Sequence, residues 1–151
     1  MRSYLVVMDE TREARAALRY AARRAARTGG AVEILAVIPP PEFSQWGGVQ
    51  AAMEEEARLR AEAMVVQASS ALAEESGLQP GITVRQGDPI KAVADMLTER
   101  DDMAALVLGA APEGGPGPLV THFAGPAAGQ LPCPLIIVPG TLPDAVLDGL
   151  A

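Results

Sequence analysis

Apolar residues gather in five short runs, which are separated by longer segments of mixed polarity. Four runs are almost continuously apolar, as in strands that are covered on both faces of a parallel sheet. These runs are residues 4–8, 32–38, 104–108 and 135–138. A brief fifth run spans residues 82–85. The pattern therefore predicts five strands.

Between these runs the apolar residues recur with a helical period. Helices are predicted over residues 11–28, 50–76 and 89–100, each with apolar positions three or four residues apart on one face. A further short helix is predicted to begin with Gly125 as its N-cap and Pro126 as its first residue. Because strands and helices alternate, the sequence predicts an α/β fold with right-handed crossovers.

The first strand ends at Asp9, the second ends near Val37, and the fourth is followed by a glycine-rich segment that starts at Gly109. In open parallel sheets, ligands bind beyond the carboxyl ends of the strands. Backbone N–H groups of a glycine loop that leads into a helix can face an anion. The sequence therefore places a candidate phosphate cradle between Gly109 and Gly125.

Two segments have no assigned role in this pattern. Residues 42–49, which follow three consecutive prolines, are predicted to form a loop that is either a connector or a lid over a ligand site. The apolar residues of the last segment, 141–151, could cover the edge of the sheet or extend a contact between two copies of the chain. We expect one domain over residues 1–140, followed by this tail.

The composition and net charge of the chain exclude several classes of binding partner. The chain has 151 residues and a net charge of −7, which argues against binding to nucleic acid or to an anionic membrane surface. No apolar run has the length needed to cross a bilayer, and no secretory signal is expected at the start. Cys133 is the only cysteine, so a reducing, cytoplasmic location is expected.

Few residue patterns suggest catalysis. His122 and Cys133 are single residues of their kind, and we interpret them as a loosely packed side chain and an inert thiol. No metal-ligand spacing and no nucleophile elbow occur. A receiver domain of the response-regulator type would need a lysine at the end of the fifth strand. The only lysine, Lys91, lies in a predicted helix, so the sequence disfavours this class. The first helix carries an arginine face that we expect to be solvated. It consists of Arg12, Arg15, Arg19, Arg23 and Arg27.

The order of these pieces resembles the universal stress protein family over nearly the whole chain. The matching pieces are the first strand with Asp9, the turn Gly87-Asp88-Pro89, the approach to Gly109, and the final strand, which begins at Leu135 and ends at Val138. The resemblance implies a three-layer, Rossmann-like fold of the adenine-nucleotide hydrolase type. Its sheet would be open, mostly parallel and five-stranded, with strand order 3-2-1-4-5 and helices on both faces. It also implies a homodimer formed through the final strand at the sheet edge.

Family members that bind ATP have a loop with a glycine, two residues, a second glycine, nine residues, and a third glycine followed by Ser or Thr. Gly109, Gly115 and Gly125 match the glycines, but five residues separate the first two, and Pro126 replaces the Ser or Thr. Proline has neither a hydroxyl group nor an N–H. Glu113 adds a negative charge to the loop.

Two hypotheses follow from this resemblance. In the first, the chain is a homodimeric regulatory or binding module, without catalytic residues, in which ATP binding is impaired or absent. In the second, it is a stress-response switch or a weak ATPase that holds ATP or AMP, with Mg²⁺, in the loop from Gly109 to Gly125. Any nucleotide would contact the residues that the resemblance implies, which are Asp9, Val37, Gly109, Gly115 and Gly125.

Overall fold

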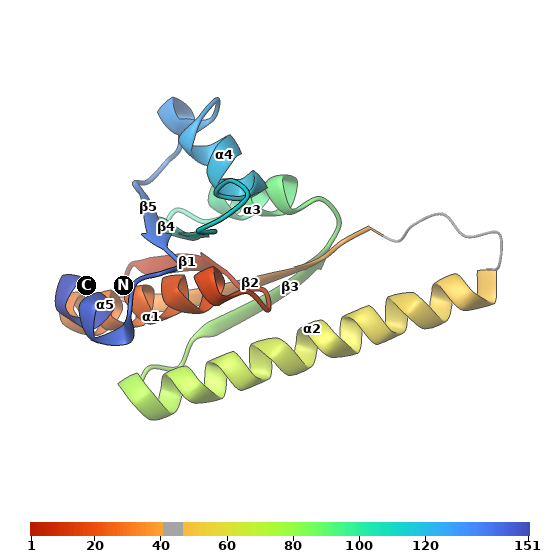
Figure 1. Ribbon diagram of the computed structural model, residues 1–151, viewed down its shortest axis with the longest axis horizontal. Helices are drawn as coiled ribbons and strands as arrows, with labels where there is room; N and C mark the ends of the chain where they lie inside the picture. Colours follow the sequence, from red (N-terminus) through yellow and green to blue (C-terminus); the bar gives the residue numbers. More distant parts are fainter. Residues whose placement is uncertain (41–46) are drawn as a thin grey trace.

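The computed structural model describes residues 1–40 and 47–151. Its centre is a sheet of five parallel strands in the order β3-β2-β1-β4-β5 (Figure 1). The strands are β1 (Ser3–Val7), β2 (Ala31–Ile38), β3 (Gly81–Gln86), β4 (Met103–Ala110) and β5 (Leu135–Pro139). The α/β prediction and the strand order are confirmed, and each predicted strand lies within two residues of its observed bounds.

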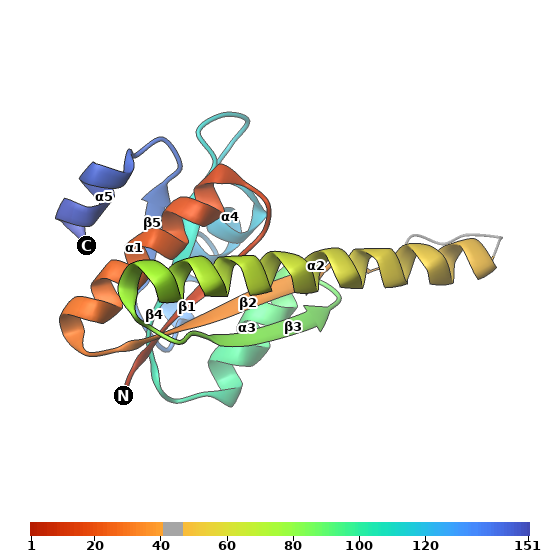
Figure 2. The same ribbon diagram turned by 90° about the horizontal axis from the view of Figure 1, so that it is seen from below.

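Helices cover both faces of the sheet (Figures 1 and 2). They are α1 (Arg12–Thr28), α2 (Gly47–Ser76), α3 (Pro89–Glu99), α4 (Pro118–Ala124) and α5 (Asp144–Leu150), with a 3-10 turn η1 (Ala128–Gln130) after α4. Side chains of α1, α2 and α5 form one apolar cluster with the sheet, and those of α3 and α4 form the other. None of the described helices is long and apolar enough to cross a membrane.

Local sequence explains where the helices begin. The hydroxyl oxygen of Thr11 accepts a hydrogen bond from the N–H of Ala14 at 3.2 Å, so Thr11 is the N-cap of α1. Asp88 caps α3 in the same way, with Pro89 at the first position, as the turn Gly87-Asp88-Pro89 predicted. The loop predicted over residues 42–49 lies partly outside the described residues, and its last three residues already belong to α2.

A buried carboxylate joins strands at the amino-terminal edge of the sheet. Glu33 of β2 is 8% exposed, and it accepts a hydrogen bond from the Thr83 hydroxyl at 2.8 Å. Arg100 lies 3.3 Å from the other oxygen of Glu33 and also donates two hydrogen bonds to Asp102. Because a buried charge is costly unless it is paired, these contacts link β2, β3 and the start of β4.

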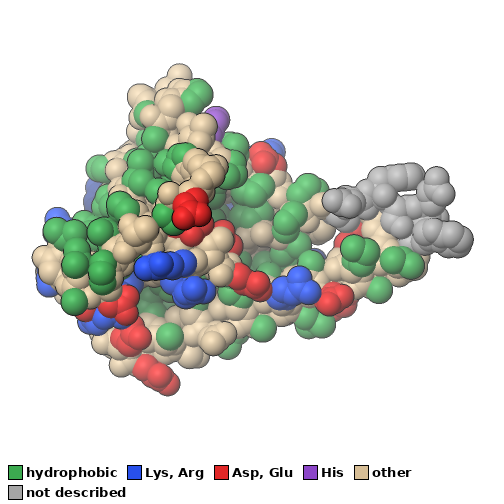
Figure 3. Space-filling model, viewed as in Figure 1, with side chains coloured by type: hydrophobic (Ala, Val, Ile, Leu, Met, Phe, Trp, Pro, Cys, Tyr) green, Lys and Arg blue, Asp and Glu red, His purple; other side chains and the backbone are tan. Residues whose placement is uncertain are grey.

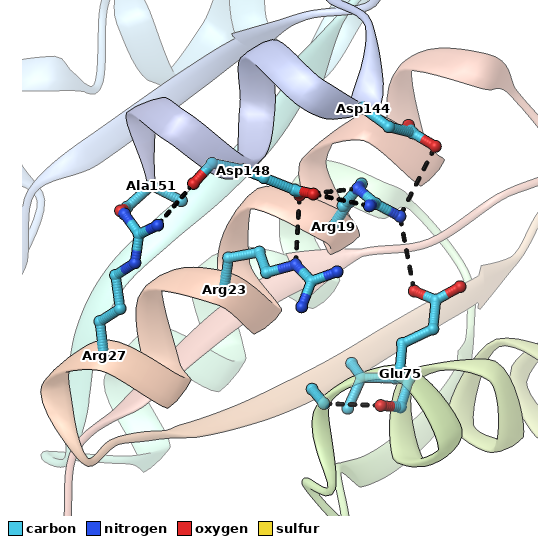
Figure 4. A network of polar contacts seen from close by, with 9 residues as sticks. Arg19, Arg23, Arg27, Glu75, Asp144, Asp148 and Ala151 are labelled. Carbon is cyan, nitrogen blue, oxygen red and sulfur yellow. Dashed lines mark hydrogen bonds and ion pairs between the residues drawn. The ribbon is translucent and has the colours of Figure 1, made fainter.

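The tail does not run along the edge strand. Helix α5 packs on α1, where Leu147 is 1% exposed, and arginines of α1 bind it (Figure 4). Arg19 donates two hydrogen bonds of 2.8 Å to the Asp148 carboxylate, and Arg23 donates a third of 3.1 Å. Arg27 donates to backbone oxygens of Asp148 and Ala151.

The prediction that the whole arginine face of α1 is solvated is therefore wrong. Arg12 and Arg15 are exposed as expected, but the last three arginines of the face hold α5. Arg19 also reaches Asp144 at 3.5 Å and Glu75 of α2 at 3.6 Å. The arginine period predicted the face, whereas its acidic partners are distant in sequence, with Glu75 lying 56 residues and Asp148 lying 129 residues from Arg19.

The contact between α5 and α1 is expected to depend on pH. The hydrogen bonds from Arg19 lower the pKa of Asp148 below its ordinary value of 3.8, so the ion pairs of Asp148 with Arg19 and Arg23 are complete above that value and are lost as the pH falls below it. Asp148→Asn should release α5 at neutral pH. Amide NMR shifts of α5, followed from pH 7 down to acidic pH, test this. Asp95→Asn, which removes only the exposed partner of Lys91, should leave α5 unchanged and serves as the control.

Candidate functional site

The carboxyl ends of the three central strands bring together three of the five residues implied by the resemblance. Strand β1 lies between β2 and β4, so Asp9, Val37 and Gly109 lie at the same edge of the sheet. Gly115 lies in the exposed loop that follows β4, and Gly125 follows α4. The topology therefore places Asp9, Val37 and Gly109 at one edge of the sheet, and a ligand site at that edge stays a prediction.

Asp9 has a local structural role. One oxygen of its carboxylate accepts a hydrogen bond from the N–H of Thr11 at 2.8 Å and another from the Thr11 hydroxyl. Both bonds close the turn between β1 and α1, just before the Thr11 cap. The Asp9 side chain is exposed, so it remains accessible from solvent while it fixes the start of α1.

Close helix packing explains the glycine at position 109. A Cβ atom at Gly109 would collide with the backbone carbonyl of Glu13 in the first turn of α1 and lie 2.9 Å from its Cβ. Gly140 is restricted by the same residue, since a Cβ there would lie 2.8 Å from the Cβ of Glu13. These two glycines let α1 approach the ends of β4 and β5. A glycine at 109 is therefore required by packing, whether or not phosphate binds.

The loop after β4 turns through glycines of positive φ. Gly114, Gly115 and Gly117 have φ values of 74°, 89° and 103°. Residues with a Cβ rarely adopt this backbone conformation. The loop is closed by a hydrogen bond of 3.2 Å from the N–H of Ala111 to the oxygen of Pro116. Its central residues, including the charged Glu113, are exposed.

The short helix near this loop does not begin where the sequence analysis placed it. Helix α4 begins at Pro118 after Gly117 and ends at Ala124, so Gly125 and Pro126 follow the helix instead of starting it. A Gly-Pro pair precedes the helix as well, and it provides the same N-terminal pattern eight residues earlier. Pro126 then prevents α4 from continuing.

His122 and Cys133 do not form a catalytic pair. The His122 ring makes an edge contact with Phe123, at 4.9 Å between centroids, and no hydrogen bond joins it to Cys133 within the described ranges. Cys133 is half-buried against the α3–α4 cluster. Burial raises the pKa of its thiol, which keeps the sulfur protonated and unreactive at neutral pH.

A cavity of about 710 Å³ lies between α1 and α2 and reaches the start of the α5 segment. We call it the α1–α2 groove. Its apolar lining includes Met8, Ala16, Met64, Leu72 and Leu142. Five arginines also line it, namely Arg12, Arg15, Arg19, Arg23 and Arg60. Of the five residues implied by the resemblance, only Asp9 lines this groove.

The sequence analysis did not identify the groove, although parts of it were visible. The arginine period of α1 and the spacing of Met64, Ala68 and Leu72 on α2 were both readable from the sequence. Nothing in either pattern indicated that the two helices face each other across an open space. The acidic lining residues, such as Glu10, Glu75 and Asp144, come from separate segments.

Comparisons with known proteins agree with this architecture. Residues 1–139 match the model of the universal stress protein family. The structure of a universal stress protein UspA from Lactobacillus plantarum aligns with a TM-score of 0.77 at 18% identity, covering 91% of this chain and 97% of that one. No curated protein matched the sequence.

Two further similar structures were solved with nucleotides. A universal stress protein from Archaeoglobus fulgidus in complex with dAMP aligns with a TM-score of 0.65 at 18% identity, covering 91% of this chain and 98% of that one. A family protein from Arabidopsis thaliana with AMP bound aligns with a TM-score of 0.56 at 13% identity, covering 92% of both chains. At these identities the likeness establishes the fold alone.

Gly109→Ala should destabilise the protein without any nucleotide present. The added methyl group overpacks the contact between β4 and α1, so the free energy of unfolding should fall by about 1–3 kcal/mol in urea denaturation. Gly129→Ala is the matched control, because a Cβ at Gly129 meets no atom within 4 Å. Equal stability of the two variants would contradict the packing role of Gly109.

Proposed function

This chain belongs to the universal stress protein family, and on that premise we propose that it is a homodimeric regulatory or binding module in which adenine-nucleotide binding is impaired. The proposal includes no catalytic role. It also places the module in the cytoplasm, in keeping with its single cysteine.

The loss of hydrogen-bond donors around α4 is the observation that carries this proposal. The helix begins with Pro118, which has no N–H, after Gly117, which has no capping side chain. At its other end, Pro126 stands where nucleotide-binding members have Ser or Thr, so a hydroxyl and an N–H are both missing. The exposed Glu113 carboxylate adds repulsion toward a phosphate group.

The expected weakening is considerable. A hydrogen bond that involves a charged group contributes about 1.5–3 kcal/mol. Losing one such bond lowers affinity by about tenfold or more, because 1.4 kcal/mol corresponds to a factor of ten. Pro126 removes two donors, so retention of a nucleotide through purification is not expected.

The sheet edge supports the homodimer. Strand β5 pairs only with β4 among the described strands, and Ile137 on it is 40% exposed. An apolar edge strand with unpaired backbone groups favours pairing with another strand. Helix α5 does not pack along this edge, so β5 remains open for a second copy.

A nucleotide-dependent switch or weak ATPase is the second candidate. Its support is that similar family structures carry dAMP and AMP and that Asp9, Val37 and Gly109 share one edge of the sheet. In this alternative the loop from Gly109 to Gly125 holds ATP or AMP, with Mg²⁺, through backbone N–H groups.

The impaired-binding proposal predicts that purified protein carries no stoichiometric adenine nucleotide. The protein is denatured, and its supernatant is chromatographed for ATP, ADP and AMP. Thermal unfolding is then measured with and without millimolar Mg-ATP, and no increase in Tm is expected. A stoichiometric nucleotide, or a Tm increase that Gly115→Leu abolishes, would instead establish the switch.

The edge-strand homodimer predicts that Ile137→Lys weakens self-association. A lysine on β5 brings two like charges together where strands from two copies pair, and edge lysines oppose such pairing. Sedimentation velocity at micromolar concentration should show a smaller species for this variant than for the wild type. Arg85→Lys, on the opposite edge strand β3, serves as the control and should leave the species unchanged.

A further inference from the structure

The amino-terminal half of α2 extends beyond the rest of the molecule. Figures 1 and 2 both show this helix projecting past the sheet. The first α2 residues that belong to or pack on an apolar cluster are Met64 and Val65. Arg60 is the first α2 residue that lines the groove, so residues 47–59 form an overhang about 20 Å long, at 1.5 Å per residue. Most helix stability in proteins comes from packing of an apolar face, and this part of α2 belongs to neither apolar cluster of the described residues.

The overhang presents apolar side chains on one side. Val49 and Met53 are 54% and 60% exposed, and with Ala57 they recur every fourth residue along one stripe of the helix. The helical period continues this stripe to Met64, Ala68 and Ala71, which line the α1–α2 groove. The exposed stripe of the overhang and the α2 wall of the groove are thus one continuous surface.

The groove carries charges of both signs, with Asp9, Glu10, Glu75 and Asp144 beside its five arginines, and the acidic residues of the overhang match the arginines. Glu54 and Glu56 flank the apolar stripe of the overhang by their positions in the helical period. The groove presents arginines from both of its walls, and Figure 3 shows basic side chains gathered where α1 faces α2. Arg19 and Arg23 already bind Asp148. Arg12 and Arg15 form no ion pair with the described residues, and Arg60 pairs only with Glu56 of its own helix.

We propose that two copies of the chain associate through this surface, with the overhang of each copy lying antiparallel in the α1–α2 groove of the other. The stripe of Val49, Met53 and Ala57 then covers the end of the groove that Ala63, Met64 and Gln67 line. Since each copy supplies both an overhang and a groove, the contact is reciprocal about a twofold axis. The occupant of the groove is thus a second copy of the same chain.

The antiparallel arrangement also pairs charges across the axis. Glu56 and Arg60 are one turn apart on α2. Within a single chain they form an exposed ion pair, with 3.2 Å between Arg60 Nη2 and Glu56 Oε1. When two such helices meet antiparallel, Glu56 of each copy faces Arg60 of the other. The same alignment sets Met53 beside the small residue Ala63 of the second copy, where there is room for its side chain.

This surface is distinct from the β5 edge and does not depend on nucleotide binding. The groove is lined by α1, α2 and the segment that follows β5, whereas the edge contact is formed by the outer side of β5 itself. Two independent twofold contacts would give an assembly larger than a dimer, and each can be removed without the other. The failure of one contact is therefore distinguishable from the failure of the other.

Met53→Glu should weaken self-association at least tenfold. The new carboxylate would be buried in the contact and would add to the charge of Glu54 and Glu56. Leu59→Glu is the matched control, because Leu59 is 56% exposed on the overhang but lies outside the stripe. Sedimentation equilibrium is measured for both variants, with and without Ile137→Lys. The Met53→Glu effect should appear in both backgrounds, and Leu59→Glu should have none.

A mixing experiment tests the pairing itself. Glu56→Arg and Arg60→Glu each place like charges together in a self-pair, so each should weaken association when alone. A mixture of the two variants restores opposite charges on both sides of the axis and should form heterodimers, detected by native mass spectrometry. Circular dichroism of each variant confirms that α2 is still helical.

Three results would overturn the proposal. The first is a wild-type assembly that Met53→Glu does not reduce. The second is an equal effect of Leu59→Glu, and the third is a failure of the two charge variants to associate when mixed. A wild type that is monomeric at micromolar concentration, or one that Ile137→Lys alone converts fully to monomer, would also overturn it.

Discussion

The close approach of α1 to the sheet is the constraint on which the rest of the structure depends. The face of α1 toward the sheet is built of small residues, and Ala17, Ala21 and Ala25 are fully buried there. Gly109 and Gly140 lie opposite the first turn of α1, where a Cβ on either residue would collide with Glu13. Small residues on both sides bring the helix axis near the strands. A larger residue at any of these positions would have to displace the helix, since protein interiors leave few voids.

This approach determines what lies on the outer side of α1. With the alanines buried, the arginines of the helix point away from the sheet, and three of them bind α5. The same helix forms one wall of the α1–α2 groove. One helix thus joins the ends of the central strands, where the family's ligand site is expected, to the surface that we propose for self-association.

The region around α4 shows how fold and site differ in what they require. The sheet needs only that the chain return from β4 to β5, and a short helix with a proline on each side achieves this. A phosphate site needs N–H and hydroxyl donors in fixed positions, and those same prolines remove them. Packing and ligand binding depend on different atoms of the same segment, so the impaired nucleotide binding that we propose is compatible with an intact family fold.

The sequence by itself determined the five strands, the three longer helices and, through the family resemblance, the strand order. Those features depend on local apolar periods and caps, such as Asp88 before Pro89, which act over a few residues. The tertiary structure alone decided which of three Gly-Pro pairs starts α4 and which carboxylates the arginines of α1 bind. It also decided that Gly109 is required by Glu13 of α1. Each of these outcomes depends on residues far apart in sequence, whose contact no local pattern specifies.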